Sequence, residues 1–490
     1  MNEYKPPRSN ALTPALQRLQ HNLATRKTVS LERHAEEARR HLQTIHHSTR
    51  CRYPGAIASS NCSSQAWAPF DPIPRLVSKP DWERLAAGLI QRIHTLEAFL
   101  QDVYGPQLVV RDGVLPRGRL EGSSLWRPDL RDLPHPPRCW CPLATPDLIR
   151  NANGDWVVLE DNLQRGFGLG FSLAARQAQM AAMPWSTAGL EITPTPQHLS
   201  SLQAMFQSLA PWAEEPSIVM ISPDYNSSSD RARQDRAVIA EALDIAIVEA
   251  SDLSCDEGKL WHYPNGTRQR IDVIYRRNDE RLPSKDGLGM DLLGVPGLDA
   301  VFACDAIAIT NPPGVGIASD KLIYTHLPEM VRYYLNEEAL LPQVPTYDCT
   351  DPVQREKVIT ELNTLVVKQA AGAGGVGVLI GPQASRKELE AMTARIQQTP
   401  RDYIAQPLQD LSTVPTLINA TLQDCAVDLR PFVIQTSDGS TQLLDAALTR
   451  VAMSADSLIV NATQGGGFKD TWIVNAPLQT LDQKVQNLNN

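Results

Sequence analysis

The 490-residue sequence contains no apolar run of about 18 residues, the length that a membrane-spanning helix requires. The segment from Met1 to Asn10 is polar, so we expect no secretory signal and place the protein in the cytoplasm. Its 8 cysteines are too scattered for a disulfide framework, and the one close pair, Cys139 and Cys141, is too tightly spaced for a usual zinc knuckle. These absences favour a cytoplasmic protein with free thiols.

The sequence also lacks an excess of positive charge. It has 46 Lys and Arg residues against 55 Asp and Glu residues, which gives a net charge of −9. A field of this sign opposes binding to nucleic acid or to an anionic membrane, although a local basic groove is compatible with it. The hydrophobic share of 42% and charged share of 21% are those of an ordinary globular protein. At about 150 residues per domain, the length predicts roughly three domains.

The pattern along the chain divides it into four segments. Residues 1–80 read as a helical extension and linker, with helices over 14–25 and 30–46. Residues 81–190 begin with a helix from Pro80 to about Gly105, which Asp81 could cap, and then carry a hairpin signal. Residues 191–325 alternate apolar runs with a helix-like stretch, which predicts a parallel, Rossmann-like unit. Residues 326–490 are mixed α+β.

The hairpin signal is the most informative stretch. Asn153-Gly154, flanked by alternating apolar residues, is typical of a two-residue turn. That turn would pair Asp147 with Glu160, their Cβ atoms about 5 Å apart, and would leave Asn162 on the same face. Two facing carboxylates repel unless a cation lies between them, and these are the hard oxygen ligands that suit Mg²⁺. A solvated hairpin end with an accidental pair of carboxylates is the alternative.

A second candidate site is a glycine-rich loop between two strands. Gly372, Gly374, Gly375 and Gly377 can present backbone N–H groups to phosphate oxygens. Lys368 lies on the strand that enters the loop, and Lys321 comes earlier. The spacing matches neither a P-loop nor a dinucleotide-binding fingerprint, and an ordinary hairpin turn is the alternative. Gly166 to Gly170 is a further stretch whose N–H groups can approach an anion, with a flexible loop as its alternative.

Several further motifs accompany these two sites, and with them the chain resembles the circularly permuted ATP-grasp family, in its branch of uncharacterised and glutathionylspermidine-synthase-like proteins. The resemblance runs from about Asp81 to Trp472. In ordinary ATP-grasp ligases the metal hairpin follows the nucleotide lysines, whereas here it precedes them, as a circular permutation would produce. The motifs that carry the resemblance are Asp102-Val-Tyr-Gly105, Leu159-Glu-Asp-Asn-Leu163, Val273-Ile-Tyr-Arg-Arg277, Leu293-Gly-Val-Pro-Gly-Leu298, Asp428-Leu-Arg-Pro-Phe432 and Gln464-Gly-Gly-Gly-Phe-Lys-Asp-Thr-Trp472.

The resemblance implies an α/β (α+β) circularly permuted ATP-grasp fold. Residues 81–190 would be the permuted part with the metal hairpin, 191–325 the pre-ATP-grasp domain, and 326–490 the nucleotide-binding and lid region. It also implies ATP with Mg²⁺, which Mn²⁺ can replace. Asp147, Glu160 and Asn162 would hold the metal, Lys321 and Lys368 would contact ATP phosphates, and the 372–377 loop would close over them. Gln406 would lie at the adenine hinge, and the residues expected to line the reacting centre are Arg430, Arg450, Asn461 and Lys469.

Three departures from the family pattern bear on the substrate. The loop after Asn162 reads Leu163-Gln-Arg-Gly-Phe-Gly168 instead of a Pro-Ser-Gly-like sequence, and the resemblance implies that this loop helps to shape the acceptor side of the site. Pro407 follows Gln406 where an acidic residue is common. Thr145 stands where several ligases have an arginine, so another basic residue must neutralise the intermediate. Arg276 is a candidate, and a strand-end surface arginine is an equally good interpretation of it.

By resemblance, the leading hypothesis is an ATP-dependent carboxylate–amine ligase that forms an amide bond through an acyl phosphate. Its substrates would be a small-molecule or peptide carboxylate and an amine. A phosphotransferase without ligation and a non-catalytic ATP-binding regulatory or scaffold protein are the alternatives. A protein partner and a homo-oligomer are both left open.

Overall fold

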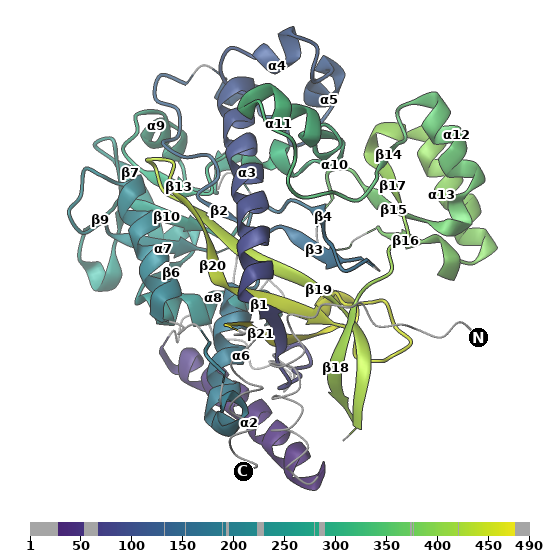
Figure 1. Cartoon of the computed structure of the whole chain (residues 1–490). Coiled ribbons are helices and arrows are strands. Elements are labelled where there is room, and N and C mark those ends of the chain that lie inside the picture. The colour runs from purple at the N-terminus through teal and green to yellow at the C-terminus, as the bar shows by residue number, and fades with distance from the viewer. Residues whose placement is uncertain are drawn as a thin grey trace.

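The structure is a computed structural model of the whole chain, and it describes residues 28–52, 67–131, 133–151, 153–188, 190–192, 196–222, 230–278, 280–283, 290–372, 375, 377–419 and 421–475 (Figure 1). The predicted helix over 14–25 and Gly374 lie outside the described residues.

The centre of the molecule is an eight-stranded sheet built from both ends of the chain. Its main path runs in the order β1-β21-β20-β19-β3-β4, and β2 and β18 also pair with β19. β1 is parallel to β21, whereas β19 is antiparallel to both β20 and β3. The strands are β1 (Arg75–Ser78), β2 (Leu143–Ala144), β3 (Asp147–Arg150), β4 (Trp156–Glu160), β18 (Thr413–Ile418), β19 (Thr421–Gln435), β20 (Thr441–Val451) and β21 (Gly467–Val474).

Helices cover both faces of this sheet, so its alternating side chains enter two different cores. On one face α3 (Lys79–Val103) crosses in front of β19 and β20 (Figure 1), and its apolar stripe packs with Leu429 and Ala447. On the other face α6 (Leu169–Ala182) and α2 (Thr28–Arg52) pack with Leu448 and Trp472. Residues adjacent along a strand therefore face different environments.

Two of the predicted helices are present with shifted limits. The helix predicted over 30–46 spans Thr28–Arg52, and Ala35, Ala38 and Leu42 on its apolar stripe are buried. The helix predicted from Pro80 begins at Lys79 and ends at Val103. Its cap is Ser78, whose side chain accepts from the Asp81 backbone N–H at 3.3 Å, so the prediction that Asp81 caps this helix was wrong.

The middle of the chain forms a separate parallel sheet, as the alternating pattern predicts. Its order is β13-β10-β5-β6, and every neighbouring pair is parallel. The helices α7 (Pro196–Leu209), α8 (Asp230–Leu243) and α9 (Leu298–Ala303) belong to this unit. Its strands are β5 (Ile218–Ile221), β6 (Ala246–Val248), β10 (Val273–Arg276) and β13 (Ala308–Thr310), and small sheets beside it hold β7 (Leu253–Asp256), β8 (Lys259–His262), β9 (Gln269–Ile271), β11 (Arg281–Pro283) and β12 (Met290–Leu292).

A smaller lobe at the right of Figure 1 carries the glycine-rich loop. Its four antiparallel strands run in the order β14-β17-β15-β16 and pack on α12 (Pro352–Thr360) and α13 (Arg386–Gln398) around a core of their own. The strands are β14 (Tyr347–Asp348), β15 (Leu365–Gln369), β16 (Leu379–Ile380) and β17 (Tyr403–Pro407). The short helices near the upper end of α3 in Figure 1 are α4 (Leu108–Arg111), α5 (Arg117–Glu121), α10 (Lys321–Tyr324) and α11 (Leu327–Leu335). Within the described ranges, no helix combines the length and the apolar character that crossing a bilayer demands.

Candidate active site

The hairpin of β3 and β4 places Asp147 opposite Glu160, as the sequence predicts. The two-residue turn at Asn153-Gly154, however, was a wrong prediction. The last pair of the hairpin is instead Asn151 with Asp155, whose carbonyl oxygen accepts from the Asn151 backbone N–H at 3.0 Å. That shift alone would move Asp147 out of register with Glu160. A bulge between Asp147 and Leu148 restores the pair, so the two irregularities offset each other.

The three residues after Val158-Leu159 alternate between the two faces of the sheet. Asp161 turns towards α3, where Arg92 donates to its two carboxylate oxygens at 2.7 Å each, and both side chains are buried. Glu160 and Asn162 project from the opposite face, with the Asn162 Nδ2 atom 3.5 Å from the Glu160 Oε1 atom. The two ends of the Glu-Asp-Asn motif thus share one environment, and its middle residue anchors the strand to a helix.

Asp147 lies in a buried network of charged residues. Arg430 on β19 donates from Nε and Nη2 to its two oxygens, at 2.6 and 2.7 Å. Arg450 on β20 donates from Nη2 to the Asp147 Oδ2 atom at 2.8 Å and also pairs with Asp428. Burial alone would raise the pKa of Asp147, but the two arginines outweigh it and hold that pKa well below its usual range. Asp147 is therefore ionised at neutral pH.

The register of the large sheet explains this network. Asp428 lies directly opposite Arg450 on β19 and β20, and Arg430 is two residues along from Asp428 on the same face. Leu429 is the partner of Leu148, which brings Arg430 beside Asp147. Sequence analysis did not select Asp428. The Asp438-Gly439 turn signal between β19 and β20 would not have revealed this pair, because a register shift between Pro431 and Val433 brings Asp428 opposite Arg450.

The two predicted lysines come from elements outside the large sheet, Lys321 from α10 and Lys368 from β15. Lys321 is the first residue of α10, which the Asp320 side chain caps by accepting from the Leu322 backbone N–H at 2.9 Å. Its Nζ atom lies 2.7 Å from the Gly372 carbonyl oxygen and 3.5 Å from the Glu160 Oε2 atom. The Lys321 ammonium group therefore contacts both the start of the glycine-rich loop and the β3–β4 hairpin.

The second predicted lysine, Lys368 on β15, is hydrogen-bonded to Gln406 on β17. The Lys368 Nζ atom donates to the Gln406 Oε1 atom at 2.8 Å, and the Gln406 Nε2 atom donates to the Thr346 Oγ1 atom at 2.9 Å. Burial lowers the pKa of Lys368, and the negative charge of Glu160 partly offsets that effect. Such a lysine gains from a nearby anion, because the anion stabilises its charged form.

One described glycine of the loop, Gly375, lies next to Asn461, whereas Gly372 and Gly377 lie against Gln369. Gly375 and Gly377 have φ angles of 76° and 73°, the left-handed region that glycine adopts without strain. A Cβ atom on Gly375 would be 2.7 Å from the Asn461 Nδ2 atom. The loop therefore touches the segment that follows β20, and two of the predicted nucleotide-binding elements come together.

Of the other predicted site residues, Lys469 lies away from this face, whereas Arg276 contacts the loop after Asn162. The Nζ atom of Lys469 is fully buried, 2.6 Å from the Asp71 Oδ2 atom and 2.7 Å from the Pro415 carbonyl oxygen. Arg450 is opposite Phe468, so Lys469 faces the other side of the sheet from Arg450. Arg276 is also buried, and its Nη2 atom donates to the Gln164 carbonyl oxygen at 2.9 Å.

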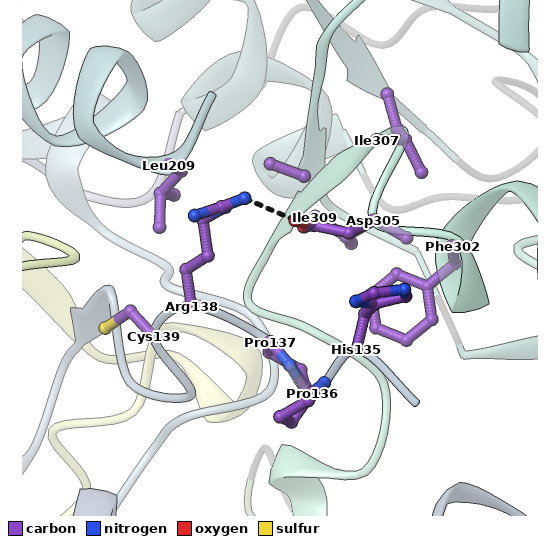
Figure 2. Close-up of a pocket in the computed structure, with 11 residues that line it drawn as sticks. His135, Pro136, Pro137, Arg138, Cys139, Leu209, Phe302, Asp305, Ile307 and Ile309 are labelled. Carbon is purple, nitrogen blue, oxygen red and sulfur yellow. Dashed lines mark hydrogen bonds and ion pairs between the residues drawn. The ribbon is translucent and has the colours of Figure 1, made fainter. Parts of the chain in front are cut away.

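A small pocket outside this site is too confined for a substrate (Figure 2). It lies between the Pro136-Pro137 turn and the segment that leads into β13, and Arg138 reaches across it to pair with Asp305. Its volume of about 20 Å³ accommodates a single water molecule. No residue of the Asp147–Glu160 pair lines it, and Cys139 beside it is a free thiol.

The oxygen donors on the hairpin fit a divalent cation, but unequally. Within the described part of the chain, Glu160 makes long contacts to Lys321 and Asn162 and interacts with the Asp147 side chain, but no arginine bonds to its carboxylate, which remains available as a ligand. Asp147 accepts three hydrogen bonds from arginines, which leaves about one of its four lone-pair positions. Mg²⁺ in nucleotide sites needs only one or two carboxylates besides phosphate and water. Glu160 and Asn162 therefore fit the cation best, with Asp147 contributing at most through its Oδ1 atom.

A sheet that carries facing carboxylates and arginines, opposite a lobe that supplies a glycine-rich loop and a buried lysine, is typical of an ATP-grasp protein. The chain belongs to the circularly permuted ATP-grasp type 2 family, which it matches over residues 74–452. The α/β (α+β) fold and the permutation predicted from the sequence are thereby confirmed, and membership of this family implies that the chain uses ATP.

The relatives include proteins of several bacteria. An uncharacterised protein of Synechocystis is 40% identical over 413 residues, covering 84% of this chain and 85% of that protein. An uncharacterised protein of Mycobacterium tuberculosis is 37% identical over 410 residues, 83% of this chain and 73% of that one. A Frankia casuarinae protein provisionally named glutamate–cysteine ligase 2-2 is 38% identical over 420 residues, which are 85% of this chain but 48% of that protein.

Among solved structures, the chain is similar to a glutathione synthetase-like effector from Globodera pallida in its apo form. The TM-score is 0.52 at 11% sequence identity, and the match covers 91% of this chain and 98% of that one. Identity this low shows a shared fold and nothing about the substrate.

Proposed function

We propose that this protein is an ATP-dependent carboxylate–amine ligase that forms an amide bond through an acyl phosphate. The observation that carries the proposal is the meeting of Glu160 with Lys321, on the sheet face that also holds Asp147, Arg430 and Arg450. Four basic side chains, counting Lys368, here face three carboxylates, counting Asp428. The local surplus is one positive charge in a protein of net charge −9. This arrangement favours polyanionic nucleotide over nucleic acid.

In the proposed reaction the γ-phosphoryl group passes from ATP to an oxygen of the substrate carboxylate, and ADP leaves. An amine nitrogen then attacks the acyl carbon, the C–N bond forms, the C–O bond to phosphate breaks, and the amine loses a proton. A divalent cation held by Glu160 and Asn162 would neutralise charge on the phosphates. No side-chain nucleophile is needed.

The arginine pair has the geometry to stabilise the transferring group. Arg430 and Arg450 use Nε and Nη2 for the buried carboxylates. The Nη1 atoms make no hydrogen bond to the described residues, so each arginine keeps a donor for an anionic substrate. Asp147 and Asp428 fix the two guanidinium groups before the substrate arrives, which lowers the reorganisation that catalysis requires.

The relatives support a ligase among the activities that ATP-grasp proteins can have. The Frankia relative has the provisional name of a glutamate–cysteine ligase, an enzyme that joins a carboxylate to an amine. This chain spans about half of that protein, so neither glutamate nor cysteine is proposed here as its substrate.

The test is a screen of amino acids, short peptides and polyamines for ADP release with Mg²⁺ and ATP. A ligase releases ADP stoichiometrically with a new amide only when both substrates are present, and hydroxylamine should trap the acyl phosphate as a hydroxamate. ADP release with a stable phosphorylated product would instead establish a phosphotransferase. Tight ATP binding without turnover for any acceptor would favour a regulatory role.

A further inference from the structure

The glycine-rich segment at the N-terminus of α6 already binds an anion, and that anion belongs to the chain itself. The backbone N–H groups of Gly168, Gly170 and Phe171 all point at the Oδ1 atom of Asp235, at 3.1, 2.9 and 3.3 Å. Asp235 comes from α8, in the parallel unit of the fold, and its side chain is fully buried. The donors that sequence analysis offered to a ligand are therefore occupied by an internal carboxylate.

A buried arginine completes the site. Arg277 donates from Nη2 to the Asp235 Oδ2 atom, and from Nη1 to the Tyr275 hydroxyl oxygen at 3.4 Å. Burial by itself lowers the pKa of Arg277, but Asp235 and Tyr275 together raise it by a larger amount, so the guanidinium stays charged. An ion pair this deeply buried is costly to desolvate, and backbone N–H groups on the carboxylate offset part of that cost.

The segment that this pair holds lies against the candidate active site. It follows Asn162, and Arg276, the neighbour of Arg277, binds the Gln164 carbonyl oxygen at 2.9 Å. Gly168 has a φ angle of 109°, and a Cβ atom there would be 3.7 Å from the Arg430 Cδ atom. The side-chain stem of Arg430 therefore packs on a segment whose path is set by the parallel unit.

We propose that Asp235 and Arg277 are positioning residues, in which the Asp235 carboxylate acts as a built-in anion that fixes the 164–171 segment beside Arg430. The filled cradle does not bind a substrate phosphate. Its role is to set the wall on the acceptor side of the site, in the segment where this sequence departs from its family. The role assigned to the acceptor side rests on the proposed ligase function, whereas the anion cradle does not.

Removing the carboxylate while keeping its partners tests the cradle directly. In Asp235→Ala, three N–H groups and the Arg277 guanidinium would converge on a space the size of a carboxylate, so sodium formate is the probe. We expect hydrogen exchange of the 166–171 amides to become about tenfold faster or more, since the segment has lost its charge-assisted hydrogen bonds. Formate should restore slow exchange, whereas formamide and sodium chloride at the same concentration should not.

A matched control is Asp272→Asn, at the other end of the same parallel unit. Asp272 is also buried and accepts from the Trp212 Nε1 atom and the Ser217 backbone N–H, at 3.0 and 3.1 Å. Its substitution should leave exchange at 166–171 unchanged. Unchanged exchange in Asp235→Ala, uniformly faster exchange across the protein, or equal rescue by formamide would each overturn the proposal.

If Asp235→Ala does not fold, the double variant Asp235→Asn with Arg277→Met replaces it. The asparagine oxygen can still accept from the three N–H groups, and no buried charge is left unpaired, so exchange at 166–171 should stay slow. Fast local exchange in this folded variant would contradict the cradle.

The effect of Asp235 on the proposed reaction is tested separately, by measuring the KM values of the substrates. With a substrate pair found in the screen above, Asp235→Ala should raise the KM for the acceptor at least fivefold and leave the KM for ATP within twofold, and formate should reverse the change. An equal rise in both KM values would refute the positioning role. If the screen finds no substrate, the ligase proposal fails while the exchange and rescue measurements still decide the cradle.

Discussion

Arg430 holds Asp147 by two parallel hydrogen bonds, from Nε and Nη2 to the two carboxylate oxygens, at 2.6 and 2.7 Å. This contact changes the interpretation of Asp147, since a carboxylate clamped in this way has little left for a cation. The first acidic residue of the hairpin thus serves mainly the arginines, which makes Glu160 the principal oxygen donor of the proposed metal site.

The first prediction separates these two carboxylates. Glu160→Gln should weaken binding of Mn²⁺ with a non-hydrolysable ATP analogue by tenfold or more, because it removes the charged ligand that has no arginine partner. Asp147→Asn should weaken it less but lower the unfolding temperature, because Arg430 and Arg450 would lose a buried partner. Electron paramagnetic resonance of Mn²⁺ and thermal unfolding measure the two effects. Equal losses of Mn²⁺ affinity would show that Asp147 is a full ligand.

The second prediction concerns Lys368 and pH. The folded pKa of Lys368 lies below its usual value, because burial disfavours the charge. Nucleotide binding requires the charged form, so ATP affinity should fall as the pH rises through this lowered pKa, at a pH where an exposed lysine is still protonated. Lys368→Met should weaken ATP binding at neutral pH and remove this dependence. Lys387→Ala, an exposed lysine on α13, should change neither, and calorimetric titration of ATP between pH 7 and pH 10 would show both results.

The third prediction concerns Lys469, which the resemblance placed at the reacting centre. Its ammonium group is fully buried against Asp71, so Lys469→Met should destabilise the fold by about 3–5 kcal/mol, the cost of leaving one buried charge alone. Adding Asp71→Asn should recover much of that loss, because the asparagine side chain carries no charge and its oxygen can still accept from the Ile73 and Leu417 backbone N–H groups. Denaturant unfolding measures the stabilities. A Lys469→Met protein of unchanged stability that fails to turn over substrate would instead support the catalytic role.

The comparison between Lys469 and Arg450 shows what the sequence can and cannot predict. The resemblance assigns both to the reacting centre, although Lys469 lies in the motif Gln464 to Trp472 and Arg450 lies beside the strand-like run before it. Only the pairing of β20 with β21 reveals that they face opposite sides of the sheet. Period-two alternation is readable within one strand, but the register between strands is set by turns and bulges that the sequence signals weakly.

In the β3–β4 hairpin, by contrast, the predicted pair of carboxylates was correct. Asp147 and Glu160 do face each other, although the turn differs from the predicted one and a bulge restores the pairing. The contact of Asp235 with Gly168 was out of reach, because it joins a loop to a helix 67 residues later. Local patterns predict which residues are available for chemistry, whereas long-range packing decides which of them are already occupied.

The last prediction tests the packing that keeps the 164–171 segment in place. Gly170 and Gly118 both lie in helices, α6 and α5, yet their surroundings differ. A Cβ atom on Gly170 would be 2.2 Å from the Asp235 carbonyl oxygen, whereas one on Gly118 would meet nothing within 4 Å.

Gly118→Ala should therefore be neutral or stabilise the protein by about 0.5–1 kcal/mol, the usual gain from alanine in a helix. Gly170→Ala should cost about 1–3 kcal/mol, because α6 and α8 must move apart. The separation should also weaken the contact between Asp235 and the N–H groups, so exchange at 166–171 should increase in Gly170→Ala alone. Equal stability of the two variants would mean that α6 and α8 do not pack closely enough for Asp235 to hold the segment.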